Sequence, residues 1–87
     1  MPADERIEHI RRIALAVPGV SGVEKTYARK TGLQYNVELH LEVDPRMTVQ
    51  DLHDPATATR FLIREKLDWV ADVIVHIEPF TGGRRNQ

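Results

Sequence analysis

Hydrophobic residues repeat along the chain with two different periods, and the changes of period divide it into five segments. In residues 4–17 apolar side chains recur every three or four positions, which predicts an amphipathic helix with Asp4 as its N-cap. Pro18 and Gly19 are poor helix formers and are expected to end this helix. The apolar stripe consists of Ile7, Ile10, Ile13, Ala14 and Val17.

The next two segments alternate apolar and polar residues with a period of two, which is typical of β-strands. The first strand is expected over about residues 22–30 and the second over residues 34–43. A loop formed by residues 31–33 would join them as a hairpin, because so short a connection favours antiparallel pairing. In this register Lys30 pairs with Gln34.

Helical periodicity returns after the second strand. Thr48 and Asp51 have the spacing of a capping box, which predicts one helix over about residues 49–67, distorted at Pro55. The aspartate directly before Pro55 is also a good N-cap, with the proline as first helical residue. In that alternative the helix begins at Pro55 and His53 lies in a loop.

The last alternating segment, residues 72–78, predicts a third strand. The order α-β-β-α-β predicts an α+β fold of the ferredoxin-like type, with two helices on one face of a three-stranded mixed sheet. The second and third strands would be parallel, since a helix connects them in a right-handed crossover. We expect one domain over residues 1–80 and a flexible tail over residues 81–87.

Composition narrows the functional classes. The 87 residues include no cysteine, which excludes disulfides, thiolate zinc sites, iron–sulfur clusters and cysteine nucleophiles. Lysine and arginine number 12 against 13 acidic residues, a net charge of −1, so no nucleic-acid partner is expected. A domain of this size buries only about two-thirds of the surface of its unfolded chain, so a partner chain or a metal ion would add stability.

The polar face of the predicted sheet carries candidate metal ligands. His40 points away from the apolar face of the second strand, and His76 and Glu78 point away from that of the third. With the hairpin register given above, Glu24 stands directly opposite His40, at a Cβ separation of about 4.5–5.5 Å. These four side chains would therefore meet on the face that the helices leave open.

His53, at the start of the second predicted helix, is expected near an end of the second strand and could reach the rim of the same site. Two imidazoles with carboxylates suit a divalent cation, zinc first, with Mn, Co, Fe, Cd and Ni as alternatives. Taken singly, each of these residues is an ordinary solvent-facing side chain, and only their meeting on one face favours a metal site. An enzyme with His76 and Glu78 as acid–base pair is disfavoured, because the sequence offers no nucleophile or phosphate-binding loop.

Three stretches resemble the C-terminal cytoplasmic domain of the cation diffusion facilitator (cation efflux) family. They are IRRIALAVPGVSGVEK, VELHLEVDPRMTVQDLH and VIVHIEP, and they extend from Ile10 to Pro79. The resemblance implies a non-enzymatic regulatory domain that forms a homodimer and senses metal at the dimer interface. In full-length relatives such a domain is cytoplasmic and is attached to the transmembrane domain of the same zinc-type transporter.

By position, His40, His53, His76 and Glu78 match ligand positions of the family, and Glu24 lies where many relatives have histidine. The glutamate makes the expected site richer in oxygen. Two alternatives to the transporter domain stay open at this point. One is a free-standing metal-binding or regulatory module without a transmembrane part, and the other is a dimerisation domain whose metal site has decayed.

Overall fold

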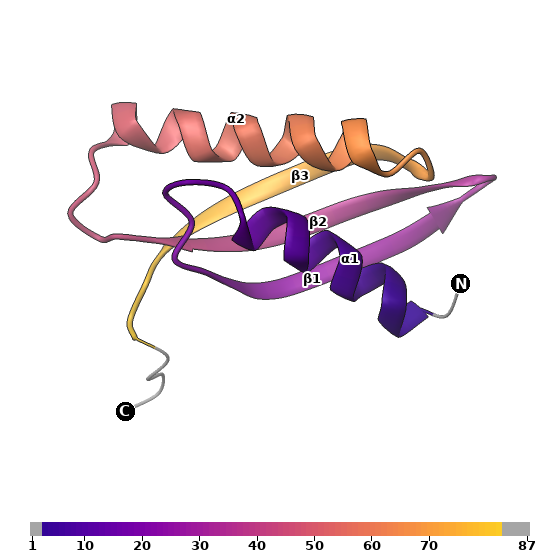
Figure 1. The fold of residues 1–87 in the computed structure, drawn as a ribbon, viewed down its shortest axis with the longest axis horizontal. Helices are drawn as coiled ribbons and strands as arrows, with labels where there is room; N and C mark the ends of the chain where they lie inside the picture. Colours follow the sequence, from indigo (N-terminus) through magenta and orange to yellow (C-terminus); the bar gives the residue numbers. More distant parts are fainter. Residues whose placement is uncertain (1–2, 83–87) are drawn as a thin grey trace.

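A computed structural model describes residues 3–82 and contains five elements in the predicted order. They are α1 (Ala3–Leu15), β1 (Gly22–Thr31), β2 (Gln34–Val43), α2 (Val49–Lys66) and β3 (Val70–Pro79). Both helices lie on the same side of the sheet (Figure 1). The α+β, ferredoxin-like architecture is therefore confirmed.

The three strands form one mixed sheet in the order β1-β2-β3, with β2 at the centre. β1 runs antiparallel to β2, and β3 runs parallel to it. A parallel pair needs a crossover connection, which α2 supplies. The parallel register places His40 directly beside His76, and Glu42 beside Glu78.

The turn between β1 and β2 is one residue shorter than the sequence analysis predicted. Thr31 pairs with Gln34, so only Gly32 and Leu33 form the loop. Gly32 has a φ of 67°, a left-handed conformation that glycine adopts without steric cost. The predicted pairing of Lys30 with Gln34 was therefore wrong by one residue.

A β-bulge in β1, close to the position opposite His40, shifts the hairpin register back by one residue. Lys25 is the partner of His40, whereas Val23 pairs with Leu41, so the register shifts between the two pairs. Glu24 is the extra residue of the bulge, and the prediction that it pairs directly with His40 was wrong. Because a bulge sets two residues against one on the partner strand, Glu24 still lies beside His40.

α2 is continuous through Pro55, as the capping-box interpretation predicted. Thr48 is the N-cap, and its Oγ1 accepts a hydrogen bond of 3.1 Å from the backbone N–H of Asp51. Pro55 removes one backbone hydrogen bond from the helix. Its ring is buried next to Gly19, where an added Cβ would lie 3.4 Å from Pro55 Cγ, and this packing offsets part of the loss.

α1 begins at Ala3, so Asp4 lies inside its first turn and is not the predicted N-cap. Asp4 and Glu5 still stabilise this end, because negative charge interacts favourably with the N-terminal pole of a helix.

β3 is longer than the predicted strand at both ends. Residues 83–87 of the predicted tail lie outside the described residues. Within residues 3–82, no helix is long and apolar enough to cross a membrane.

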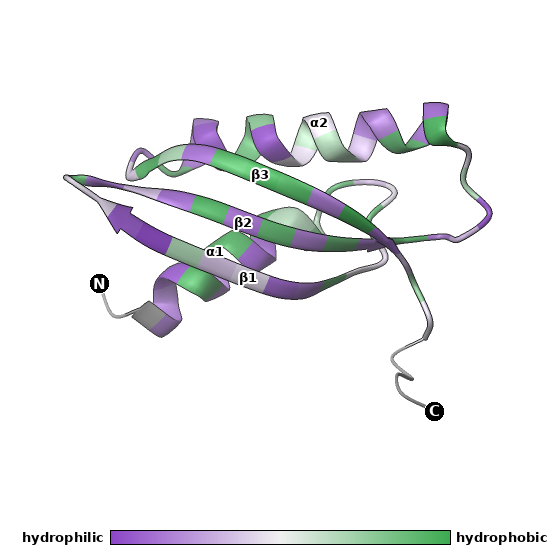
Figure 2. Cartoon of the chain, turned by 180° about the vertical axis from the view of Figure 1, so that it is seen from behind, coloured by the Kyte–Doolittle hydropathy of each residue, from purple (hydrophilic) through white to green (hydrophobic). Residues whose placement is uncertain are grey.

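The core fills the space between the helices and one face of the sheet. In β2 the residues at odd positions from 37 to 43 are buried, and those from 37 to 41 belong to one core cluster with Ile10 of α1 and Ile63 of α2. The largest fully buried side chains are Ile10, Leu39, Leu41, Ile63, Val37, Val73 and Thr59. No helix of the described part of the chain covers the other face of the sheet, and Figure 2 shows the three strands from that side, in front of both helices.

Replacement of the buried α2 side chain tests this packing. We expect Ile63→Ala, at a position with 0% exposure, to lower the free energy of unfolding by about 2–5 kcal/mol, because it leaves a cavity in the core. Phe61→Ala, at a position on the same helix that is 62% exposed, is the matched control and should change it little. Urea unfolding at one fixed protein concentration measures both. Equal losses for the two variants would contradict the assignment of the buried face.

Candidate metal centre

Two histidine rings stack on the open face of the sheet. The ring centroids of His40 and His76 are 4.6 Å apart, and the ring planes differ by 20°. The direct pairing of these residues in the β2–β3 register brings the rings together. The side chain of His40 is 19% exposed and that of His76 46% exposed, so the first is sheltered and the second is accessible to solvent.

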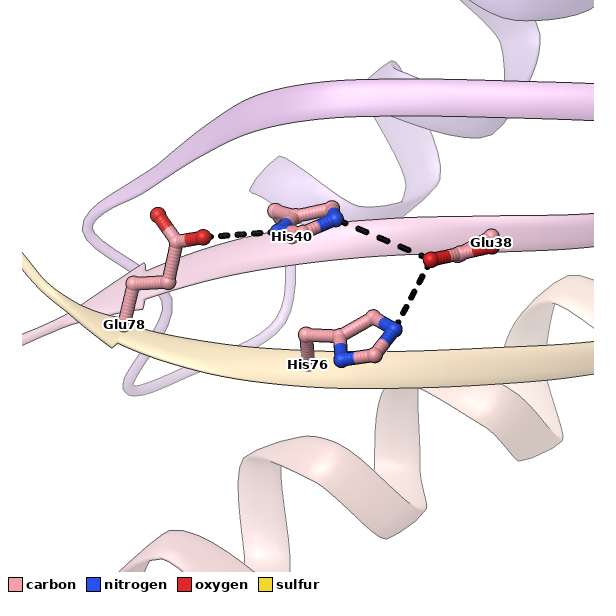
Figure 3. Close-up of polar contacts among 4 residues, drawn as sticks. All are labelled: Glu38, His40, His76 and Glu78. Atoms are coloured by element: carbon pink, nitrogen blue, oxygen red, sulfur yellow. Dashed lines mark hydrogen bonds and ion pairs between the residues drawn. The ribbon is translucent and has the colours of Figure 1, made fainter.

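Each imidazole contacts a carboxylate from the neighbouring strand (Figure 3). His40 Nδ1 lies 2.6 Å from Glu78 Oε2, and His76 Nε2 lies 2.9 Å from Glu38 Oε2. The same oxygen of Glu38 is 3.8 Å from His40 Nε2. Since an ionised carboxylate only accepts hydrogen bonds, His40 Nδ1 and His76 Nε2 are the nitrogens that carry the donated protons.

The donor atoms form two groups of three that share His40. One group is Glu38, His40 and His76, and the other is Glu24, His40 and Glu78. Within each group the donor atoms all lie within 4.8 Å of one another. Ligands bonded to one zinc ion at about 2.0–2.2 Å are separated by roughly 3.4 Å, so small side-chain movements would allow either group to hold a divalent ion.

Glu78 is held in its ionised form. A side-chain hydrogen bond with Glu24 is the largest cause that lowers the pKa of Glu78 from its ordinary value. The hydrogen bond from His40 is the second cause, and attraction to His40 and Lys25 adds to it, while burial acts in the opposite direction. An ionised carboxylate is the form that binds a metal ion or orients an imidazole by accepting a hydrogen bond from its ring N–H.

The structure brings four of the five predicted ligands together. Glu24, His40, His76 and Glu78 all belong to the two groups on the open face. His53 belongs to neither, because it lies on α2, on the other side of the sheet. It is exposed, with its Nε2 3.4 Å from Thr57 Oγ1, and its role as a ligand stays a prediction.

Glu38 is the functional candidate that the sequence analysis missed. The alternation along β2 already placed it on the same face as His40, two residues away. From the sequence alone, a glutamate at such a position is interpreted as a solvated surface charge. Its role becomes visible only when the residues beside it on the neighbouring strand are known. In the β2–β3 register Glu38 lies beside Ile74, and His76 follows Ile74 two residues later on the same face of the sheet. The register therefore places Glu38 close to His76 on the open face.

Residues 2–80 match the family model described as "Cation efflux protein, cytoplasmic domain". This chain belongs to the cation efflux family. It is 32% identical over 71 residues to Metal tolerance protein 2 of Oryza sativa subsp. japonica, a match that covers 82% of the chain and 18% of that protein. It is 27% identical over 84 residues to the Cation-efflux pump FieF of Pectobacterium atrosepticum, covering 97% of the chain and 28% of the pump.

The chain thus spans less than a third of the length of these cation efflux relatives. Its fold matches a solved variant of MamM CTD with a TM-score of 0.86 and 26% identity, over 97% of this chain and 93% of that one. A nickel form of MamM CTD matches with a TM-score of 0.82 and 28% identity, over 87% and 98%. A manganese form matches with a TM-score of 0.82 and 27% identity, over 88% and 99%. These matches place the chain in a family of cation efflux domains and not of enzymes.

The lowered pKa of Glu78 predicts a pH-dependent contribution to stability. A group whose pKa is lower in the folded state stabilises the fold above its unfolded pKa, about 4.3 for glutamate, and loses this effect as the pH falls through the folded value. We therefore expect Glu78→Gln to reduce stability slightly at neutral pH, by less than about 1 kcal/mol because the pair is partly exposed. The difference from the parent should vanish in acid. Urea unfolding of metal-free protein across this pH range measures it, and a difference that persists in acid would contradict the assignment.

Proposed function

We propose that this chain is the regulatory metal-binding and dimerisation domain of a divalent-cation efflux transporter, with zinc as the first candidate ion. The observation that carries the proposal is the direct pairing of His40 with His76 on a face without a helix, flanked by carboxylates of both strands. Membership of the cation efflux family supports the assignment to an efflux transporter.

The donor set supports zinc first and leaves room for harder ions. Two imidazole nitrogens suit Zn, Co, Fe and Ni, while the carboxylates of Glu24, Glu38 and Glu78 extend the choice towards Mn. Cd is a further candidate. Cysteine is absent, so the site lacks the thiolates that select Cu(I). The nickel and manganese forms of the similar MamM CTD support a divalent transition metal here.

The open face also supports association with a second copy. Tyr27 and Ile74 lie on this face beside the metal centre and are 54% and 56% exposed. Large apolar side chains next to a polar site are a common feature of protein interfaces. A homodimer through this side or edge of the sheet would cover them and would bring ligands from two chains close together.

Metal sensing then follows from a difference in affinity. If the ion binds the compact dimer more tightly than the open one, its binding shifts the population by that difference and by no more. A coupling of about 1–3 kcal/mol is typical of regulated proteins and would suffice to report cytoplasmic metal to an attached transmembrane domain. The full-length chain would then be membrane-bound, with this domain on the cytoplasmic side.

Removal of the two imidazoles tests the proposal. We expect His40→Ala and His76→Ala each to weaken zinc binding at least about tenfold, and the double variant to abolish it, because each removes a ligand. His9→Ala on α1 is the matched control, since this histidine lies outside both donor groups. Calorimetric titration of Zn²⁺ into chelator-treated protein measures the affinities.

The outcomes separate the proposal from its alternatives. Zinc binding by the double variant at the parent affinity would contradict the proposed site. A stable dimer without any metal binding by the parent would favour a dimerisation domain whose site has decayed. Metal binding by a gene product without membrane helices would instead favour a free-standing module.

His53 is proposed as a further ligand only within a dimer. His53 lies outside the metal centre of its own chain, so it would act as a ligand only at the metal centre of a second copy. We expect zinc to increase the fraction of dimer and His53→Ala to reduce this increase, with little change in the stability of metal-free protein because the side chain is exposed. Light scattering during the titration measures the mass. Unchanged zinc affinity and unchanged dimer formation in His53→Ala would remove this residue from the ligand set.

A further inference from the structure

The second part of α2 is anchored in the domain much more firmly than the first. The buried side chains of this helix are Pro55, Thr59 and Ile63, which follow one another at about one turn on a single face. In residues 49–54, before the proline, Leu52 is partly buried and the other residues are exposed. If this first part left the helix, little apolar surface would be transferred to water, so little hydrophobic free energy opposes the change.

Pro55 weakens the hydrogen bonds of α2 at the same position. A proline has no backbone N–H, so it cannot donate to the C=O of Asp51, and its ring crowds that carbonyl. The ring is buried next to Gly19, and this packing belongs to the second part of the helix and not to residues 49–54. The boundary between the weakly and the firmly held part therefore coincides with a break in the hydrogen-bond ladder.

The residue before this proline is able to begin a helix of its own. Aspartate is among the best N-cap residues, and proline is favoured at the first helical position because its fixed φ suits the helix. In the present structure Thr48 is the N-cap, with its Oγ1 3.1 Å from the backbone nitrogen of Asp51. Asp54 is exposed, and within residues 3–82 its carboxylate has no hydrogen bond or ion pair, so it is available as a second cap.

We infer that α2 has two alternative starts, and that residues 49–54 leave and rejoin the helix as one unit. Pro55 is the boundary of this unit. In the longer form, which the structure shows, Thr48 caps the helix. In the shorter form Asp54 takes over as N-cap and satisfies N–H groups of the new first turn.

This pair of forms makes the start of α2 a hinge. In the shorter form the connection after β2 extends from residues 44–48 to residues 44–53, while the buried part of the helix stays in place. Leu52 and His53 are then carried by the connection and not by the helix. No metal ion is needed for the change, so the hinge goes beyond the proposed function and can be tested in metal-free protein.

The two forms differ in which backbone N–H groups are hydrogen-bonded. In an α-helix that begins at Pro55, the first bond runs from the N–H of Ala58 to the C=O of Asp54. The amides of residues 52–57 lose their helical bonds in this form, and later amides keep them. We therefore expect residues 52–57 to share one low protection against deuterium exchange, with a sharp rise at Ala58 to the high protection of Ile63. NMR of the metal-free chain, residue by residue, measures these values.

Substitutions at the two caps should shift the balance in opposite directions. Thr48→Ala removes the cap of the longer helix and should lower the protection of residues 52–57 roughly fivefold. Asp54→Val removes the cap of the shorter helix at nearly unchanged helix propensity, and should raise the same protection roughly fivefold. Asp54→Asn removes the same charge but keeps a good N-cap, so it is the matched control and should change the protection little.

The protection of Ile63 is the internal reference in every variant, because it reports the opening of the whole domain. A gradual rise of protection from Leu52 to Thr57 would indicate ordinary fraying from Thr48 and would overturn the inference. Unchanged protection of these amides in Asp54→Val would also overturn it, because the second cap would then have no effect.

Discussion

The parallel pairing of β2 with β3 is the constraint on which the site depends. This register sets His40 beside His76, and every contact of the candidate metal centre follows from that alignment. The crossover through α2 fixes the strands as parallel, and the burial of Leu39 and Ile63 between sheet and helix holds the register. A shift of one residue would turn the histidine of one strand towards the core, so the packing that stabilises the fold also orients the ligands.

The open face combines features that stability alone would not favour. Two imidazoles stack at 4.6 Å between carboxylates of both strands, and exposed apolar side chains lie beside them. In an isolated domain such a surface adds little to stability, since partly exposed ion pairs are screened by water. An ion or a second copy of the chain bound on this surface, as proposed, would add to the stability that a core of this small size provides.

Sequence periodicity predicted the order of elements, the helix through Pro55 and the common face of His40, His76 and Glu78, because each follows from local spacing. The position of Glu24 depended on the number of residues in a turn. A loop of Gly32 and Leu33 moved the hairpin register by one residue, and the bulge at Glu24 moved it back. Neither feature has a clear local signal, so two errors largely cancelled at the site. Glu38 was missed because its importance comes only from the neighbouring strand.

The central claim is that a divalent ion binds on the open face of the sheet through His40 and His76. X-ray diffraction from crystals grown with Zn²⁺, measured at the zinc absorption edge, tests it most directly. We expect an anomalous peak on this face, within about 2.0–2.1 Å of one ring nitrogen from each histidine. Zinc-saturated crystals in which His40 and His76 have no such peak between them, while ordered zinc lies elsewhere on the chain, would contradict it.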